Sequence, residues 1–187
     1  MLCNAAHPCK AAHLIDQSLH MLQHRGQDSA GIVTATKEGT LSLTKGLGLV
    51  SRLENVASMR GHYGVGHVRY PTAGTKAIED CQPLYSSYPY GLALAHNGTI
   101  TNAEVLRERL RDDFHHINTS GDSEVILHLF AEELQRKRLR ELQPDDIFDS
   151  VRSIMRTIKG GYAVAILINN IGILAFRDIN GIRPLCI

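Results

Sequence analysis

Three helix-like segments follow one another in this chain, with short strand-like segments before and after them, and this order constrains the fold most strongly. The helical patterns cover about residues 102–113, 122–137 and 144–158. Asn102 can cap the first of these helices, and Pro144 suits the first turn of the third. A group of helices between two groups of strands favours two sheets with the helices packed outside them. The sequence therefore predicts an α+β fold.

The remaining segments are shorter and are separated by turn residues. Residues 11–23 form a further helical pattern, because their apolar side chains recur on one stripe. Six segments are predicted to be strands: 32–35, 41–45, 61–70, 91–98, 161–168 and 171–177. Asn97-Gly98 is expected to turn the chain after the fourth strand, and Asn169-Asn170 to join the last two as a hairpin.

The composition indicates a single domain over residues 1–187, with neither nucleic acid nor a membrane as a partner. Hydrophobic residues make up 43% of the chain, which suits one core and is too little for two comfortable domains. The 20 Lys and Arg residues nearly balance the 19 Asp and Glu residues, so the net charge of +1 creates no field that attracts polyanions. The sequence has no cationic leader before an apolar core and no apolar run of about 18 residues. We therefore expect a soluble, cytoplasmic protein.

The cysteine and histidine residues show no disulfide or metal-binding pattern. The four cysteines include no CxxC pair, and the ten histidines include no HExxH. These spacings argue against a disulfide framework and a structural zinc site, and no cofactor is expected in this chain. The cations within residues 136–140 follow Glu132 and Glu133, and we interpret them as the solvated face of a helix.

Four short polar clusters are harder to explain by structure alone. They are HRGQDSAG (24–31), HVRYPTAG (67–74), AHNG (95–98) and SGDSE (120–124). Each has a structural explanation when it is taken singly. Arg69 could end a surface strand, Asp122 could cap a helix, and Asp28 could be a loop carboxylate. Asn97-Gly98 could be an ordinary hairpin turn.

Together with CQPLY, KGGYAV and FRDINGIRPL, these clusters occur in an order and spacing that resembles a class II glutamine amidotransferase domain. The resemblance extends from about Leu14 to Cys186 and implies the four-layer αββα fold of the N-terminal-nucleophile (Ntn) hydrolases. Within this class, HRGQD and RYPTAG resemble the amidophosphoribosyltransferases, which open purine biosynthesis. The related glucosamine-forming synthases usually carry HRGYD and RWATHG instead.

The resemblance implies a role for each of five residues in a glutamine site. Arg69 would pair with the α-carboxylate of glutamine in a bidentate, charge-assisted contact, and Asp122 would accept the α-ammonium group. Thr72 would help to position the substrate. Asn97, through its side-chain amide, and Gly98, through its backbone N–H, match the family's oxyanion hole. These donors would stabilise the charge that develops when the amide carbonyl is attacked.

The family's nucleophile is a cysteine at the amino terminus, usually within CGIxG, where its free α-amino group activates the thiol. This sequence begins MLCNAAHPCK, and Leu2 is too large for the usual removal of Met1. Two interpretations are open. Cys3 is the nucleophile of a divergent terminus, or the start of the first strand is missing and Cys3 is only a buried apolar residue. The early position of HRGQD favours the second interpretation. Cys9 is a weaker candidate still, and Cys81, before Gln82-Pro83, is interpreted as a packing residue.

The resemblance also implies a wider setting for the domain. The chain stops at RPLCI, where the family continues into a phosphoribosyltransferase domain, so we expect it to be truncated at both ends. That other domain would require Mg²⁺ and would use the ammonia to aminate phosphoribosyl pyrophosphate. Glutamine is the expected ligand here, and the intact protein is expected to form a homo-oligomer. Arg25 and Asp28, in the HRGQD turn, would support the site structurally.

Two other functions are compatible with the sequence. The chain could bind glutamine without hydrolysing it, as a catalytically inactive fragment that lacks the N-terminal cysteine. It could also be an Ntn hydrolase for another amide, although Arg69 and Asp122 suit the two charges of an amino acid better.

Overall fold

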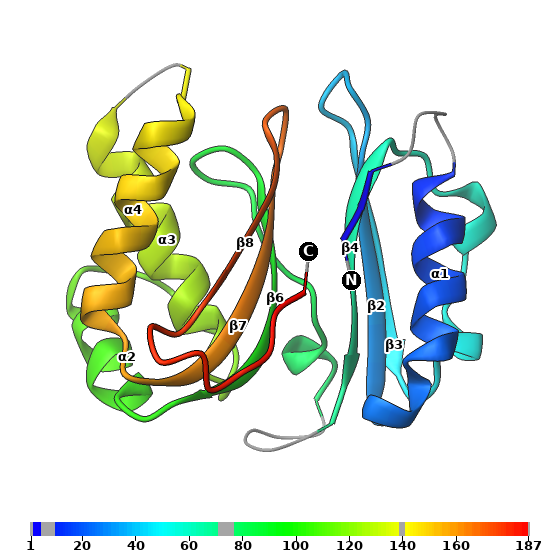
Figure 1. The fold of residues 1–187 in the computed structure, drawn as a ribbon, viewed down its shortest axis with the longest axis horizontal. Helices are drawn as coiled ribbons and strands as arrows, with labels where there is room; N and C mark the ends of the chain where they lie inside the picture. Colours follow the sequence, from blue (N-terminus) through cyan, green and yellow to red (C-terminus); the bar gives the residue numbers. More distant parts are fainter. Residues whose placement is uncertain (1, 5–9, 71–76, 139–140, 187) are drawn as a thin grey trace.

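The computed structural model describes residues 2–4, 10–70, 77–138 and 141–186 of the 187-residue chain. Within these ranges, two four-stranded antiparallel sheets face each other, and four α-helices cover their outer faces (Figure 1). Helix α1 (Ala11–Met21) lies outside the first sheet. Helices α2 (Ala103–Asp112), α3 (Ser123–Lys137) and α4 (Pro144–Thr157) lie outside the second. The predicted α+β fold with four αββα layers is confirmed.

The first sheet is covered by a single helix. Its strands, in the spatial order β1-β4-β2-β3, are β1 (Leu2–Asn4), β4 (Tyr63–Arg69), β2 (Ser29–Ala35) and β3 (Leu41–Leu47). Ile15 and Leu19 of α1 are buried in one apolar cluster with Ile32 of β2. A Cβ atom on Gly66 of β4 would lie 2.3 Å from Ile15 Cγ2, so the missing side chain at Gly66 allows α1 to pack closely.

The second sheet is covered by three helices and carries the larger core. Its strands, in spatial order, are β5 (Leu84–Ser86), β6 (Leu92–Ile100), β7 (Gly160–Ile168) and β8 (Gly172–Arg177). Leu110, Phe130, Ile154 and Tyr162 are buried in the cluster that joins this sheet to the helices. The turn predicted at Asn169-Asn170 does connect β7 to β8.

The two sheets meet through a smaller apolar cluster. Val33 and Val65 come from the first sheet, and Ala93 and Leu167 come from the second. These side chains are completely buried. Because they are short or branched, they fill the space between two sheet faces without polar atoms. Away from this cluster, strands of the two sheets carry polar residues that line one pocket, among them Arg69 and Asn97.

Two residues occupy predicted helix-cap positions but direct their side chains elsewhere. Asn102 precedes α2, yet its Oδ1 accepts a hydrogen bond from Lys159 N–H at 2.9 Å, and its Nδ2 donates to Thr157 O at 3.0 Å. Asp122 precedes α3, but its carboxylate makes no capping bond and instead accepts a hydrogen bond from Ile100 N–H. The helix starts were therefore predicted correctly. The cap expected from the Asn102 side chain was wrong, and the structural alternative that Asp122 only caps a helix is not supported.

The turn predicted at Asn97-Gly98 was also wrong. Strand β6 continues past both residues, with Asn97 opposite Ala163 and Gly98 opposite Tyr162 in β7. Gly98 has φ = +143°, and a Cβ atom there would lie 2.1 Å from Gly161 O. Asn-Gly tolerates positive φ in a turn, but here the partner strand pairs with both residues and glycine permits a close backbone approach instead.

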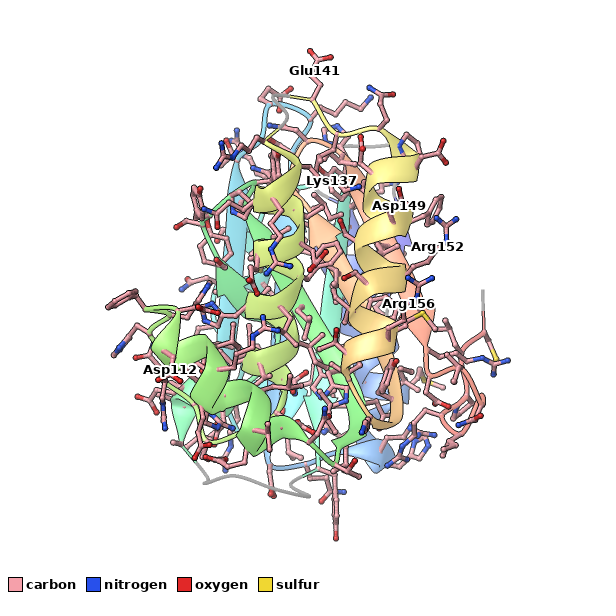
Figure 2. All side chains as sticks on the ribbon, turned by 90° about the vertical axis from the view of Figure 1, so that its left-hand side faces the viewer. Asp112, Lys137, Glu141, Asp149, Arg152 and Arg156 are labelled. Atoms are coloured by element: carbon pink, nitrogen blue, oxygen red, sulfur yellow. The ribbon has the colours of Figure 1, made fainter. Side chains whose placement is uncertain are left out.

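The outer face of α3 and α4 carries charges of both signs, among them the labelled Lys137, Asp149, Arg152 and Arg156 (Figure 2). Arg136 forms ion pairs with glutamates one turn earlier on α3. The interpretation of residues 136–140 as a solvated helix face is therefore confirmed for Arg136 and Lys137, while residues 139–140 lie outside the described ranges. Among the helices of the described chain, none is long and apolar enough to cross a bilayer.

Candidate functional site

A pocket of about 390 Å³ lies where the end of β4 approaches β6 and the start of α3. Four of the five predicted site residues line it: Arg69, Asn97, Gly98 and Asp122. Arg69 comes from the first sheet, and the other three come from the second sheet and the segment before α3. Thr72 lies outside the described residues. The structure thus brings these four residues together, and their binding roles stay predictions.

Arg69 brings a positive charge into the pocket from the end of β4. The residue is only 7% exposed, and its Nη2 lies 3.9 Å from Asp80 Oδ2. Its backbone is held by the HRGQD turn, because Asp28 N–H donates to Arg69 O at 3.2 Å. A Cβ atom on Gly26 would lie 2.6 Å from the carbonyl carbon of Arg69, so this turn packs directly against the arginine. Arg25 of the same turn also lines the pocket.

Asp122 brings a negative charge from the segment before α3, on the side of the second sheet. Its Oδ2 accepts a hydrogen bond from Ile100 N–H at 2.8 Å, and its Oδ1 lies 3.4 Å from His96 Nδ1. Burial acts to raise the pKa of Asp122, but the hydrogen bond and charge of His96 and the Ile100 N–H together bring this pKa below its ordinary value. Asp122 is therefore ionised at neutral pH and has a fixed orientation.

A buried hydrogen-bonded network supports this carboxylate. Gln82 Oε1 accepts from His96 N–H at 2.7 Å, and Gln82 Nε2 donates to Ser123 Oγ at 2.9 Å. Ser123 Oγ lies 3.0 Å from His96 Nδ1, which closes the network beside Asp122. Within the described part of the chain, His96 Nε2 is buried and has no hydrogen-bond partner. His96 lines the pocket, so a polar ligand group can supply that partner.

His67 lines the same pocket as a neutral side chain. Burial lowers the pKa of His67 to about 3, and the nearby His96 and Arg69 also act to lower it. At neutral pH, Arg69 and the Asp122 carboxylate are thus opposite charges on the pocket wall, with His67 uncharged. A zwitterionic ligand matches this arrangement, because each of its charges can meet the opposite one.

Residues 67–187 match the family model described as a glutamine amidotransferase domain. The chain belongs to this family. It is 47% identical over 177 residues to the amidophosphoribosyltransferase of Schizosaccharomyces pombe, an alignment that covers 92% of this chain and 33% of that protein. With the Escherichia coli amidophosphoribosyltransferase, the identity is 46% over 175 residues, covering 91% of this chain and 35% of that protein. The chain spans about a third of the length of these curated relatives.

Two solved structures have the same fold as this glutamine amidotransferase domain. The glutamine phosphoribosylpyrophosphate amidotransferase of B. subtilis, complexed with ADP and GMP, has a TM-score of 0.79 and 32% identity, covering 98% of this chain and 37% of that chain. A structure titled as the allosteric regulatory enzyme of purine biosynthesis has a TM-score of 0.81 and 34% identity, with the same coverage. The relatives of this chain are therefore enzymes of the family that the sequence motifs indicated.

The cysteines of this amidotransferase domain are placed only in part. The backbone of Cys3 pairs with Gly64, and β1 runs antiparallel to β4, so its N-terminal end is directed toward the Arg69 end of β4. The side chain of Cys3 and the whole of Cys9 lie outside the described residues. Cys81 is buried and does not line the pocket, which agrees with its interpretation as a packing residue.

Three members of the site were not predicted from the sequence: Gln82, His96 and Ser123. Gln82 and His96 lie in CQPLY and AHNG, two segments that carried the resemblance, and Ser123 lies in SGDSE. The motifs therefore contained these residues, but neither spacing nor composition shows that the three form a hydrogen-bonded network. Among the described residues, no group of three or more His, Cys, Asp and Glu side chains could hold a metal ion.

Proposed function

We propose that this domain binds glutamine in the pocket between the sheets and releases ammonia from the side-chain amide. The carrying observation is that a buried arginine from the first sheet and an ionised aspartate from the segment before α3 line one pocket with Asn97 and Gly98. A bidentate contact from Arg69 to the α-carboxylate and an ion pair from Asp122 to the α-ammonium would orient the amino acid. Its side chain would then reach toward the adjacent β6 residues.

Asn97 and Gly98 would act on the reaction rather than on binding. Attack on the amide carbonyl places negative charge on its oxygen, and the Asn97 side-chain amide and Gly98 N–H would donate to that oxyanion. This charge develops only in the transition state. Removal of the Asn97 donor should therefore raise the activation free energy of turnover by about 3–4 kcal/mol and leave glutamine affinity unchanged.

Binding and turnover make separate demands on the chain. Turnover also needs a nucleophilic cysteine with a base beside it, and Cys3 is a weak candidate because an amide replaces its free amine. The alternative function is thus glutamine binding without turnover. Steady ammonia release that disappears in Cys3→Ala would support an active chain and would contradict this alternative.

We further propose that the ammonia serves the amination of phosphoribosyl pyrophosphate in the first step of purine biosynthesis. The amidophosphoribosyltransferase relatives, about two thirds of whose length lies beyond the matched region, support this proposal. The partner would be a phosphoribosyltransferase domain that uses Mg²⁺, within a cytoplasmic homo-oligomer. Phosphoribosyl pyrophosphate-dependent consumption of glutamine by the longer protein would test it.

Calorimetry tests the binding assignment with glutamine and with two analogues, each of which lacks one of its charged groups. Arg69→Ala and Asp122→Ala should each weaken glutamine binding by about ten- to a hundredfold, because each removes a charge-assisted contact. The analogue 4-carbamoylbutanoic acid lacks the α-amino group, so Asp122→Ala should not weaken its binding further. The analogue 4-aminobutanamide lacks the α-carboxylate, so Arg69→Ala should not weaken its binding further. Equal losses for all three ligands would contradict the assignment.

A further inference from the structure

Arg107 of α2 is a buried cation whose guanidinium holds consecutive backbone carbonyls. Its Nη1 donates to Thr119 O at 2.7 Å, and its Nη2 donates to Ser120 O at 3.0 Å and to Gly121 O at 2.8 Å. Arg107 is only 5% exposed, whereas its carboxylate partner Glu104 is largely in solvent. The main contacts of this buried charge are therefore with the segment that precedes α3, which we call the 118–121 loop.

Glu124 of α3 holds the N–H groups of the same loop. Asn118 N–H donates to Glu124 Oε1 at 3.1 Å, and Thr119 N–H donates to Glu124 Oε2 at 2.6 Å. Burial acts to raise the pKa of Glu124, but hydrogen bonds from His128, Thr119 and Asn118 outweigh burial and bring the pKa to about 2. The 118–121 loop is thus bound by a cation on its carbonyl groups and by an anion on its amides.

The 118–121 loop touches both charged walls of the pocket. Thr119 and Gly121 line the pocket, and Asp122 follows directly in the chain. Ser120 Oγ lies 3.4 Å from Asp80 Oδ2, and Asp80 in turn pairs with Arg69. A shift of this loop would therefore move the Asp122 carboxylate and the group that pairs with Arg69.

We propose that Arg107 and Glu124 are positioning residues for glutamine: they fix the 118–121 loop so that Asp122 and Arg69 keep the spacing of an amino-acid head group. The proposal rests on the proposed function of the pocket. Three carbonyls converge on one planar guanidinium, an arrangement that the point charge of lysine cannot reproduce. Neither residue lines the pocket, so each acts through the backbone of the loop.

The test uses matched charge-removing variants on one helix. Arg107→Met removes the contact with the loop, and Arg109→Met removes an equal charge two positions later, where the arginine pairs with Glu132. Arg107→Met should weaken glutamine binding by about ten- to a hundredfold, as expected when a binding group is misplaced, and Arg109→Met should leave it unchanged. Calorimetry would measure affinity, and amide hydrogen exchange would follow residues 118–121.

Chemical rescue separates positioning from general stability. Millimolar guanidinium should restore glutamine affinity in Arg107→Ala, whereas methylammonium should not, because only the planar ion can reach several carbonyls at once. Arg107→Lys should recover only part of the affinity. For 4-carbamoylbutanoic acid, which lacks the α-ammonium group, the loss in Arg107→Met should shrink, since the Asp122 contact is absent from both proteins.

Three results would overturn the proposal. The first is a folded Arg107→Met that binds glutamine like the unchanged chain. The second is an equal loss in Arg107→Met and Arg109→Met. The third is a failure to fold by both Arg107→Met and Glu124→Gln, which would assign the pair to domain stability. Failure of the unchanged chain to bind glutamine is a different outcome, because it would overturn the proposed function itself and the positioning role with it.

Discussion

The two walls of the pocket are supported in different ways. Arg69 stands at the end of a strand in the sheet that a single helix covers, and its backbone rests on the HRGQD turn (Figure 1). Asp122 stands before α3, on the sheet that three helices cover, and it belongs to a network of buried side chains. The turn thus holds the backbone of Arg69, whereas Ile100 N–H and His96 hold the carboxylate of Asp122 itself.

This difference teaches where the domain tolerates change. Backbone packing against glycine fails when a side chain is added, as at Gly26 beside Arg69. A buried polar network fails when one member loses its partner, because the remaining groups stay desolvated and unpaired. Substitutions that act through packing and through charge can therefore test the two supports separately.

The largest expected effect distinguishes two glycines, one in each sheet. In Gly98→Ala, the new methyl group would meet the backbone oxygen of Gly161 at 2.1 Å, and φ is +143°. In Gly66→Ala, it would meet the Cγ2 methyl group of buried Ile15 at 2.3 Å, which a shift of helix α1 can relieve, and the backbone of Gly66 does not have the positive φ of Gly98. We expect a loss of about 3–5 kcal/mol for Gly98→Ala and about 1–3 kcal/mol for Gly66→Ala. Urea unfolding would measure both, and equal losses would contradict the distinction.

The next effect concerns His67 of the first sheet and depends on pH. Its pKa is about 3 in the folded protein and 6.5 ordinarily, so the unfolded chain binds the proton first as pH falls. Stability is therefore fully present above pH 6.5 and is lost as pH falls toward 3. In urea titrations, His67→Gln should flatten the decline in the free energy of unfolding between pH 6.5 and 4.5. The lower limit is the ordinary pKa of glutamate, below which carboxylates also bind protons. An unchanged slope in this window would contradict the assignment.

Glu124 of helix α3 should act in a lower pH window. Its pKa is about 2 in the folded protein and 4.5 ordinarily, so its contribution is present above pH 4.5 and is lost as pH falls toward 2. Glu124→Gln should therefore reduce stability at neutral pH and flatten only this lower part of the curve. Flattening above pH 4.5 in Glu124→Gln would show that the two supports are coupled rather than separate.

Sequence patterns predicted the fold better than the supports of the site. Apolar periodicity located the helices, because each helix buries one apolar stripe. The order of the motifs indicated the family, and the family resemblance predicted that Arg69, Asn97, Gly98 and Asp122 share one pocket. The role of Asn97-Gly98 within a strand was not predictable, since the same dipeptide also favours turns. The wrong turn at Asn97-Gly98 and the wrong cap at Asn102 have the same cause. Local propensity does not include the contacts that distant segments make with these residues in the folded chain.

The distant contacts were the least predictable part. In the sequence, Arg107 looks like an ordinary cation on a helix surface, as Arg109 does two residues later. Only the folded chain shows that Arg107 contacts the 118–121 loop. Gln82 and His96 are 14 positions apart, and their hydrogen bond depends on the approach of two segments that have no shared period. Burial, rather than residue type, distinguishes these side chains from surface ones.

The smallest expected effect lies on the outer face of helices α3 and α4, where the charged side chains pair with one another in contact with solvent. Lys137 Nζ lies 3.6 Å from Asp149 Oδ2, and both side chains are partly or largely in solvent (Figure 2). Exposed pairs gain little, because water screens the charges and ordering the side chains costs entropy. Lys137→Met should change the free energy of unfolding by less than about 0.5 kcal/mol. Asp149→Asn and the double variant would complete a cycle whose coupling should be equally small and should vanish at high salt. A loss above about 1 kcal/mol in Lys137→Met would show that charges on the outer face stabilise the fold as the buried ones do.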